Sequence, residues 1–140
     1  MTPTQKTYPS TEVASDLAAE LQRLIRGEVR FDGTSRMLYS TDASLYQVTP
    51  IGVVLPKDRD DVQAVVELAA KRGVPILPRG GGSSLAGQAV GAALVMDFSK
   101  HMDKVLGIDL EAQIVTAEAG VNLGALNRQL AALGWMIGPD

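Results

Sequence analysis

Cysteine is absent from the 140 residues of this sequence, and His101 is its only histidine. The first absence excludes disulfides, thiolate metal sites, iron–sulfur ligands and cysteine nucleophiles from this stretch. The single histidine argues against a catalytic triad or a multi-histidine metal site. No apolar run approaches the roughly 18 residues that a membrane span needs. Met1 to Ser10 is polar and has no apolar signal core, so we expect a cytoplasmic protein without a transmembrane segment.

The charge balance is slightly acidic, with 13 basic and 16 acidic side chains and a net charge of -3. This balance argues against a nucleic-acid-binding module, in which a basic patch would be expected. It leaves room for a small phosphate-bearing ligand, because backbone amides bind anions without net charge. Hydrophobic residues make up 46% of the chain and charged residues 21%, so we expect a buried core and no disorder.

The first part of the chain predicts one helix. Ser10 or Thr11 can cap it, and Gly27 can end it in the left-handed conformation. Apolar residues recur at helical spacing on one face: Val13, Leu17, Leu21, Leu24 and Ile25. We expect a short strand over 28–31, then turn formers to residue 50, with Tyr39 and Tyr46 as packing residues.

A strand, a helix and a second strand follow in the pattern of a βαβ unit, with parallel strands and a right-handed crossover. The strands are expected over 51–56 and 74–78. The helix between them has Asp58 as its cap, Gly73 as its stop and an apolar stripe of Val62, Val65, Val66 and Ala69.

The remaining elements are a third strand over 92–98, a hairpin over 104–108 and 113–117, and a last helix. Asn122 can cap this helix, with Gly134 at its end and an inward face of Leu123, Leu126, Leu130 and Leu133. The predicted fold class is therefore α+β. An α/β-like first subdomain, a small βαβ parallel sheet with flanking helices, precedes the start of a second α+β subdomain.

A glycine-rich stretch runs from Arg79 to Gly91. The segment that stands apart from the rest of the chain is Pro78-Arg79-Gly80-Gly81-Gly82-Ser83-Ser84-Leu85-Ala86-Gly87-Gln88. Consecutive glycines allow positive φ, so that successive amides can point into one concavity and bind an anion. The two serines add hydroxyl groups and Arg79 adds a cation, which could pair with phosphate, support the loop or pair with Asp97. The stretch follows a parallel strand, at the edge where α/β sheets bind ligands.

Two common phosphate motifs do not fit this stretch. A Walker A loop needs Lys and Ser or Thr after its second glycine, and Gln88 and Ala89 stand there instead. A Rossmann fingerprint that began at Gly80 would need Gly or Ala where Leu85 stands. The stretch is therefore a phosphate loop of another kind, or a flexible surface turn.

Several segments together resemble a known family. Beside the glycine-rich stretch these are Tyr39-Ser40-Thr41-Asp42-Ala43-Ser44, Val53-Val54-Leu55-Pro56 with Asp61-Val62, Val115-Thr116-Ala117-Glu118-Ala119-Gly120-Val121, and Pro139-Asp140. They resemble the FAD-binding domain of p-cresol methylhydroxylase, vanillyl-alcohol oxidase and the FAD-linked 2-hydroxyacid dehydrogenases. The glycolate oxidase D subunit and D-lactate dehydrogenase form the nearest branch.

The resemblance implies a domain plan and a set of cofactor contacts. Residues 1–34 would be a tail and a helix, and 35–140 the N-terminal part of an FAD-binding domain with a subdomain boundary near 100–105. The cofactor-binding residues would be Pro78, Arg79, Gly80, Gly81, Gly82, Ser83, Ser84, Leu85, Gly87, Gln88, Pro139 and Asp140. Family members with covalent FAD at this loop carry histidine where Ser83 stands, so non-covalent FAD is implied here.

The reaction implied by the resemblance is hydride transfer from a 2-hydroxyacid, such as D-lactate, glycolate or D-2-hydroxyglutarate, to flavin N5. An electron acceptor would then reoxidise the flavin. The catalytic base would lie after residue 140, so no catalytic residue and no metal ligand is expected in this stretch. Two alternatives remain open: a free-standing nucleotide- or phosphate-binding module, and an inert fragment without cofactor.

The other chemically active residues have simpler readings. His101 is expected to be an exposed turn residue, since no partner motif accompanies it, and Asp42 a turn or cap residue. Trp135 is expected in the core or over an edge, and Glu118 as a solvated carboxylate.

Overall fold

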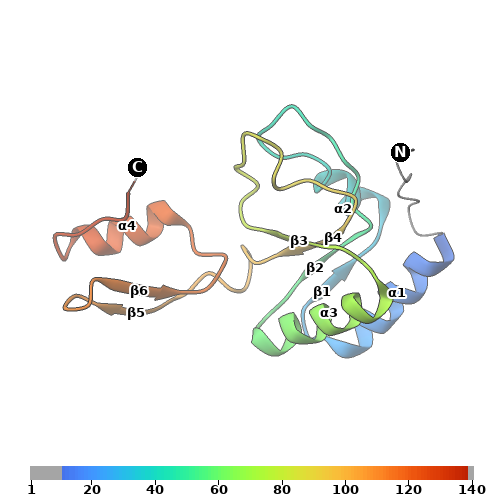
Figure 1. Ribbon diagram of the computed structural model, residues 1–140, viewed down its shortest axis with the longest axis horizontal. Coiled ribbons are helices and arrows are strands. Elements are labelled where there is room, and N and C mark those ends of the chain that lie inside the picture. Colours follow the sequence, from blue (N-terminus) through green and yellow to red (C-terminus); the bar gives the residue numbers. More distant parts are fainter. Residues whose placement is uncertain (1–10, 139–140) are drawn as a thin grey trace, which may run out of the picture.

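The computed structural model describes residues 11–138, with side chains from residue 14 onward. A four-stranded sheet and a two-stranded sheet lie at opposite ends of the molecule, joined by residues 98–104 (Figure 1). The elements of the larger part are α1 (Thr11–Leu24), β1 (Glu28–Arg30), α2 (Gly33–Leu38), β2 (Gly52–Leu55), α3 (Arg59–Arg72), β3 (Ile76–Arg79) and β4 (Leu94–Asp97). Those of the smaller part are β5 (Val105–Asp109), β6 (Ile114–Ala117) and α4 (Leu123–Ala131).

The larger sheet has the strand order β1-β2-β4-β3. Strands β2 and β3 both run parallel to β4, which lies between them, whereas β1 pairs antiparallel with β2. Every residue of β2 and β4 is buried, because helices cover one face and loops cover the other. That double burial explains why both strands are continuous apolar runs without polar alternation.

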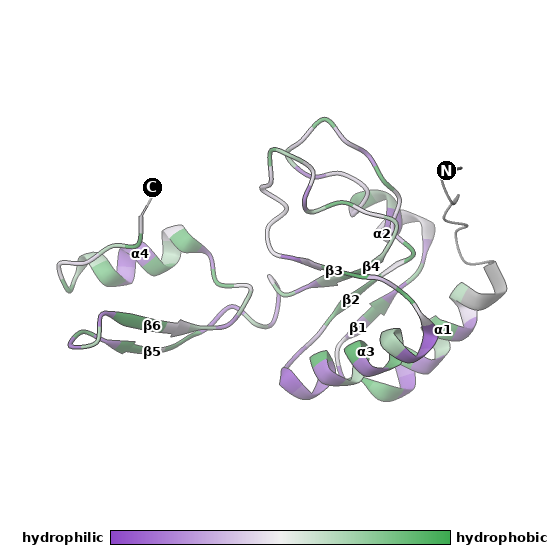
Figure 2. Ribbon diagram, viewed as in Figure 1, coloured by the Kyte–Doolittle hydropathy of each residue, from purple (hydrophilic) through white to green (hydrophobic). Residues whose placement is uncertain are grey.

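Side chains of the sheet alternate between two cores. On one face Val54, Leu94 and Met96 pack with Leu21 of α1 and Val65 of α3, all at most 2% exposed. On the other face Val53, Leu55 and Val95 pack with Tyr39 and Leu77. Figure 2 shows the apolar side of α1 and α3 turned toward the sheet. The α+β fold class predicted from the sequence is confirmed.

The helix ends follow the expected capping chemistry in most places. Asp58 accepts hydrogen bonds from the amides of Asp60 and Asp61 at the start of α3, and Gly73 ends that helix with φ of +64°. Asn122 accepts from the amide of Ala125 and caps α4. These side chains satisfy backbone groups that have no partner inside the helix.

Gly27 does not end α1 in the left-handed conformation, since its φ is not positive. Glycine is required there for a different reason: a Cβ would collide with the carbonyl oxygen of Leu55. The α2 helix was missed entirely, although Asp32 caps it by accepting from the amide of Ser35. The strands predicted as parallel are joined in the same sheet by the antiparallel edge strand β1.

The inward faces of three helices were predicted only in part. In α4, Leu126 and Leu130 are buried as expected, whereas Leu123 and Leu133 are exposed. In α3, Val66 is exposed while Val65 and Ala69 are buried, and in α1 Leu24 is exposed. Trp135 is exposed, so its placement in the core is wrong, and its placement over an edge stays a prediction. No described helix is long and apolar enough to cross a membrane.

Asp61 is a buried carboxylate, 3% exposed, that joins two turns. Its two oxygens accept hydrogen bonds from the amides of Arg26 and Lys57, each at 2.9 Å. It therefore ties the turn after α1 to the turn before α3.

Asp61→Asn should lower the free energy of unfolding by about 1–3 kcal/mol, because an amide NH2 group would then face a backbone N–H that has lost its acceptor. Urea unfolding of the intact protein measures this. The exposed neighbour Asp60 lies in the first turn of the same helix, so Asp60→Asn is the control and should cost less than about 1 kcal/mol. Equal losses in the two variants would contradict the buried role of Asp61.

His101 is only partly exposed, contrary to the expectation from sequence, and it has a carboxylate partner. Its Nε2 lies 3.0 Å from Oε1 of Glu28, an oxygen that also accepts from Lys100. The other oxygen of Glu28 binds Arg30. Lys100, then Arg30 and His101 lower the pKa of Glu28 from 4.5 to about 2. The cluster connects β1 with the turn that leads out of the sheet.

A carboxyl whose pKa is depressed by folding contributes stability above its unfolded pKa, and this contribution is lost as the pH falls through the folded pKa. Glu28→Gln should therefore flatten the dependence of unfolding free energy on pH between 4.5 and about 2. Denaturation series across this range measure the slope, with the exposed turn residue Glu111, changed to Gln, as the control. An unchanged slope in Glu28→Gln would show that the ion pairs add no acid-dependent stability.

Candidate functional site

A loop, and no helix, connects the adjacent parallel strands β3 and β4. Parallel neighbours need a long crossover, usually a helix, and residues 80–93 take that place here. This 80–93 loop lies on the side of the sheet opposite to α1 and α3, beside the 39–51 loop that joins α2 to β2 (Figure 1). The amide of Ala43 donates to the carbonyl of Gly82 at 3.0 Å, which links the two loops.

The amides at the start of the 80–93 loop have no partner. Within residues 11–138, the N–H groups of residues 80–85 donate to no protein acceptor. A Cβ added to Gly80 or Gly81 would meet nothing within 4 Å, so a ligand can approach the backbone there. A run of accessible, unpaired amides is the feature that binds phosphate groups.

Two glycines of this loop have positive φ, Gly82 at +68° and Gly87 at +79°. A Cβ on Gly82 would strike the guanidinium of Arg79, and one on Gly87 would lie 2.6 Å from Cδ2 of Tyr46. Both positions thus combine a left-handed backbone with a close neighbour, and only glycine meets both demands without strain.

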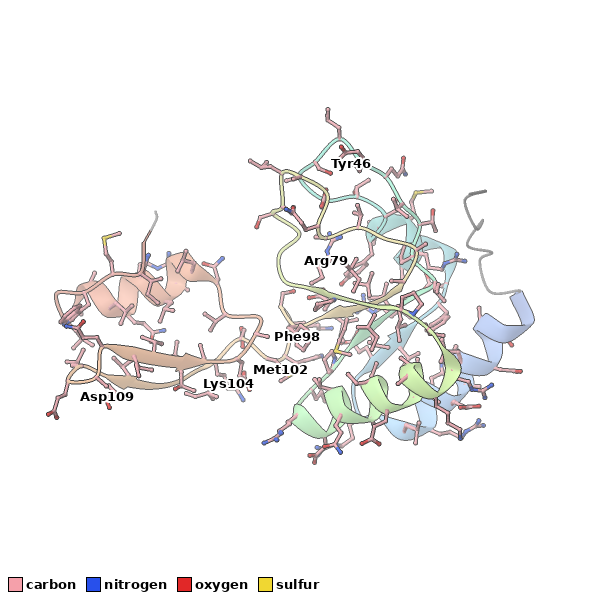
Figure 3. The ribbon with its side chains drawn as sticks, in the orientation of Figure 1. Tyr46, Arg79, Phe98, Met102, Lys104 and Asp109 are labelled. Carbon is pink, nitrogen blue, oxygen red and sulfur yellow. The ribbon has the colours of Figure 1, made fainter. Side chains whose placement is uncertain are left out.

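Arg79 lies beneath the loops (Figure 3). Its Nη1 donates to the carbonyl of Ala89 at 2.9 Å and lies 3.5 Å from that of Tyr39. The guanidinium carbon is 5.2 Å from the centre of the Tyr39 ring, within cation–π range. Of the roles open to Arg79 from the sequence, support of the loop is the one with contacts here. Pairing with Asp97 is wrong, because Asp97 accepts from the Tyr39 hydroxyl and the Ser99 amide.

Asp42 and Tyr39 lie at the candidate site, where the sequence predicted a turn or cap residue and a packing residue. Asp42 accepts from the amide of Ser44, as a turn residue does, and its second oxygen accepts from the amide of Ala89 at 3.2 Å. These bonds, that of Ser44 first, lower the pKa of Asp42. Burial, and then the bond to Asp97, raise the pKa of Tyr39 to about 12, so its hydroxyl stays a donor at neutral pH.

Ser84 closes a tight turn at the far side of the loop. Its hydroxyl oxygen accepts from the amides of Ala86 and Gln88, and its proton is directed at the side-chain oxygen of Gln88. Ser83 is exposed, and no described residue hydrogen-bonds its side chain. Ser83 therefore has a free hydroxyl, whereas Ser84 already stabilises the loop.

The structure brings together most of the residues singled out from the sequence. Pro78 and Arg79 end β3, Gly80 to Leu85 form the exposed part of the loop, and Gly87 and Gln88 face the side of Tyr46 and Ser84. Pro139 and Asp140 lie outside the described residues. The contribution of the 39–51 loop was missed, although the Tyr39 to Ser44 segment carried part of the family resemblance. No group of acidic or histidine residues in the described part could hold a metal ion.

Comparison with known proteins decides the family. Residues 50–140 match the FAD binding domain. The chain belongs to this FAD-binding family. FAD is accordingly its cofactor, as expected from the sequence, and the unpaired amides of the 80–93 loop fit a pyrophosphate.

Curated proteins with similar sequences include a dehydrogenase and an oxidase subunit that are much longer than this chain. A D-2-hydroxyglutarate dehydrogenase of Escherichia coli (strain K12) is 35% identical over 122 residues, which are 85% of this chain and 12% of the relative. The glycolate oxidase subunit GlcD of Bacillus subtilis (strain 168) is 33% identical over 121 residues, 83% of this chain and 26% of the relative. The chain thus spans about an eighth to a quarter of the length of these relatives.

Solved structures agree with this placement. An alkyldihydroxyacetonephosphate synthase superimposes with a TM-score of 0.76 at 25% identity, over 90% of this chain and 26% of the other. A p-cresol methylhydroxylase shares the fold with a TM-score of 0.68 at 19% identity, over 89% of this chain and 26% of the other. The family resemblance read from the sequence is confirmed.

Gly82→Ala should abolish tight FAD binding, because it places a Cβ in a left-handed backbone and against Arg79. Gly91→Ala, in the same loop, is the matched control, since its Cβ would meet only Leu77 at an ordinary contact distance of 3.7 Å and its φ is not positive. Titration of the stripped protein with FAD measures both. We expect a rise in Kd of at least about 100-fold for Gly82→Ala, from strain and displacement that cost about 3 kcal/mol. A loss as large in Gly91→Ala would point to a general need for glycine in this loop and not to the Arg79 contact.

Proposed function

We propose that this chain is the N-terminal part of the FAD-binding domain of a flavin-dependent dehydrogenase or oxidase that acts on a 2-hydroxyacid. D-lactate, glycolate and D-2-hydroxyglutarate are the candidate substrates, and a separate electron acceptor completes the reaction. The observation that carries the proposal is the run of unpaired amides at residues 80–85, which lies within the segment that matches the family. The names of the relatives support the substrate class.

The residues proposed to hold the cofactor follow from the geometry of the loop. The amides of Gly80, Gly81, Gly82 and Ser83 would bind the pyrophosphate, with the free hydroxyl of Ser83 as a further donor. Ser84 would contribute by keeping its turn closed. Gly87 and Gln88 would lie toward the flavin, and Pro139 and Asp140 would belong to the next contacting segment.

The chemistry of the reaction belongs to the cofactor, because bound FAD accepts a hydride at N5. The residues of this chain bind and orient it. Rigid, prealigned amides lower the entropy that binding costs and need no net positive charge, which suits a chain with an excess of acidic residues. No described residue is proposed as the catalytic base or as a metal ligand.

We propose that the cofactor is bound non-covalently through this loop. Covalent attachment in the family uses a histidine where Ser83 stands, and residues 78–91 contain no histidine or cysteine. The proposed domain plan has a tail and helix over 1–34 and the FAD-binding part over 35–140, with a boundary near 100–105. The cytoplasmic compartment expected from the sequence stays a prediction.

The purified intact protein should show the absorption bands of oxidised flavin, and acid precipitation should release FAD into the supernatant. Under anaerobic conditions D-lactate, glycolate or D-2-hydroxyglutarate should bleach those bands, whereas 3-hydroxybutyrate, which lacks a 2-hydroxyl group, should not. A pellet that keeps the flavin would overturn non-covalent binding. A colourless protein that binds another nucleotide but no FAD would favour a nucleotide-binding module, and one that binds neither would favour an inert fragment.

A further inference from the structure

Arg79 is the last residue of β3, directly before the 80–93 loop. Its guanidinium contacts backbone carbonyls and an aromatic ring. Its guanidinium lies between the Tyr39 ring and the backbone of Gly82, and it donates to Ala89 at the opposite end of the same loop. The side chain thus contacts the segment that carries the unpaired amides, at Gly82, and the later part of the same loop, at Ala89.

The Tyr39 ring that supports this guanidinium is itself fixed to the sheet. Its hydroxyl donates to Oδ2 of Asp97 at 2.5 Å, and Oδ1 of Asp97 accepts from the amide of Ser99 at 2.8 Å. Asp97 is the last residue of β4 and is 6% exposed. A rigid path of contacts therefore runs from the buried end of β4 through Tyr39 and Arg79 to the loop.

Few hydrogen bonds tie the loop to other segments. Apart from those of Arg79, they run from the Ala43 amide to the Gly82 carbonyl, from the Ala89 amide to Asp42, and from the Ile51 amide to the carbonyl of Ala93 beside β4. The first two end at residues that Arg79 contacts, Gly82 and Ala89. Loss of the guanidinium would loosen these two together.

We propose that Arg79 is a positioning residue, which holds the 80–93 loop in the shape that presents its amides to the pyrophosphate and does not itself bind the phosphate. The inference rests on the proposed FAD site, but its first consequence concerns the protein without ligand. Lysine cannot replace arginine in this role, because an ammonium group lacks the planar surface that stacks on Tyr39 and the fork that reaches the carbonyls.

Hydrogen exchange of the ligand-free intact protein tests the proposal apart from FAD. In Arg79→Lys and in Arg79→Met, the amides of Ala43 and Ala89 should exchange about tenfold faster or more, because the loop opens locally. Tyr39→Phe keeps the ring and loses only the bond to Asp97, so it should raise the same rates by a smaller factor. Arg72→Lys, at the end of α3 where Arg72 pairs with Glu20 of α1, is the control and should leave them unchanged.

FAD titration then separates positioning from direct contact. Positioning predicts that Arg79→Lys and Arg79→Met weaken FAD binding by similar factors, about tenfold, with the amides of Val54 and Val95 in the strands still protected. Direct phosphate binding predicts that lysine largely restores affinity and that exchange at Ala43 and Ala89 stays at the wild-type rate, and either result would overturn the proposal. If wild-type protein binds no FAD, the proposed function fails, and the exchange rates alone still decide the role of Arg79.

Discussion

The structure depends on one constraint, which is that β3 and β4 are parallel neighbours joined without a helix. A helix would have paired its own backbone groups as it crossed the sheet. The 80–93 loop crosses instead with the amides of residues 80–85 unpaired, and it must be held by contacts from outside. Arg79, Tyr39, Asp42 and Ala43 supply those contacts. The loop therefore lies over buried strands and depends on side chains of neighbouring segments for its shape.

Several acidic side chains of this chain have structural roles, because they accept hydrogen bonds that hold its turns and strands together. Asp61 and Asp97 are buried, and each accepts two hydrogen bonds from groups that would otherwise lack a partner. Asp42 and Glu28 are held ionised by their donors. The site proposed for the anionic cofactor is compatible with a net charge of -3, because oriented amides attract an anion at short range whatever the overall charge.

Much of the secondary structure could be predicted because its signals are local. Asp58 and Gly73 mark the two ends of α3, and Asn122 marks the start of α4. The missed α2 is six residues long with a glycine at its start, so neither periodicity nor propensity identifies it. Gly27 was misread because a glycine is needed equally for a left-handed backbone and for close packing, and only the position of Leu55 tells which applies.

The sequence by itself determined the family and the cofactor, and it singled out the loop that we propose as the site, because these depend on a contiguous run of glycine and serine and on flanking motifs. Only the tertiary structure decided which partners the side chains around the loop take. Tyr39 and Asp97 are 58 positions apart, and Asp42 and Ala89 are 47 apart. Contacts of such separation leave no periodic or local pattern in the sequence, since they arise when β4 is inserted between β2 and β3 and brings the two loops together.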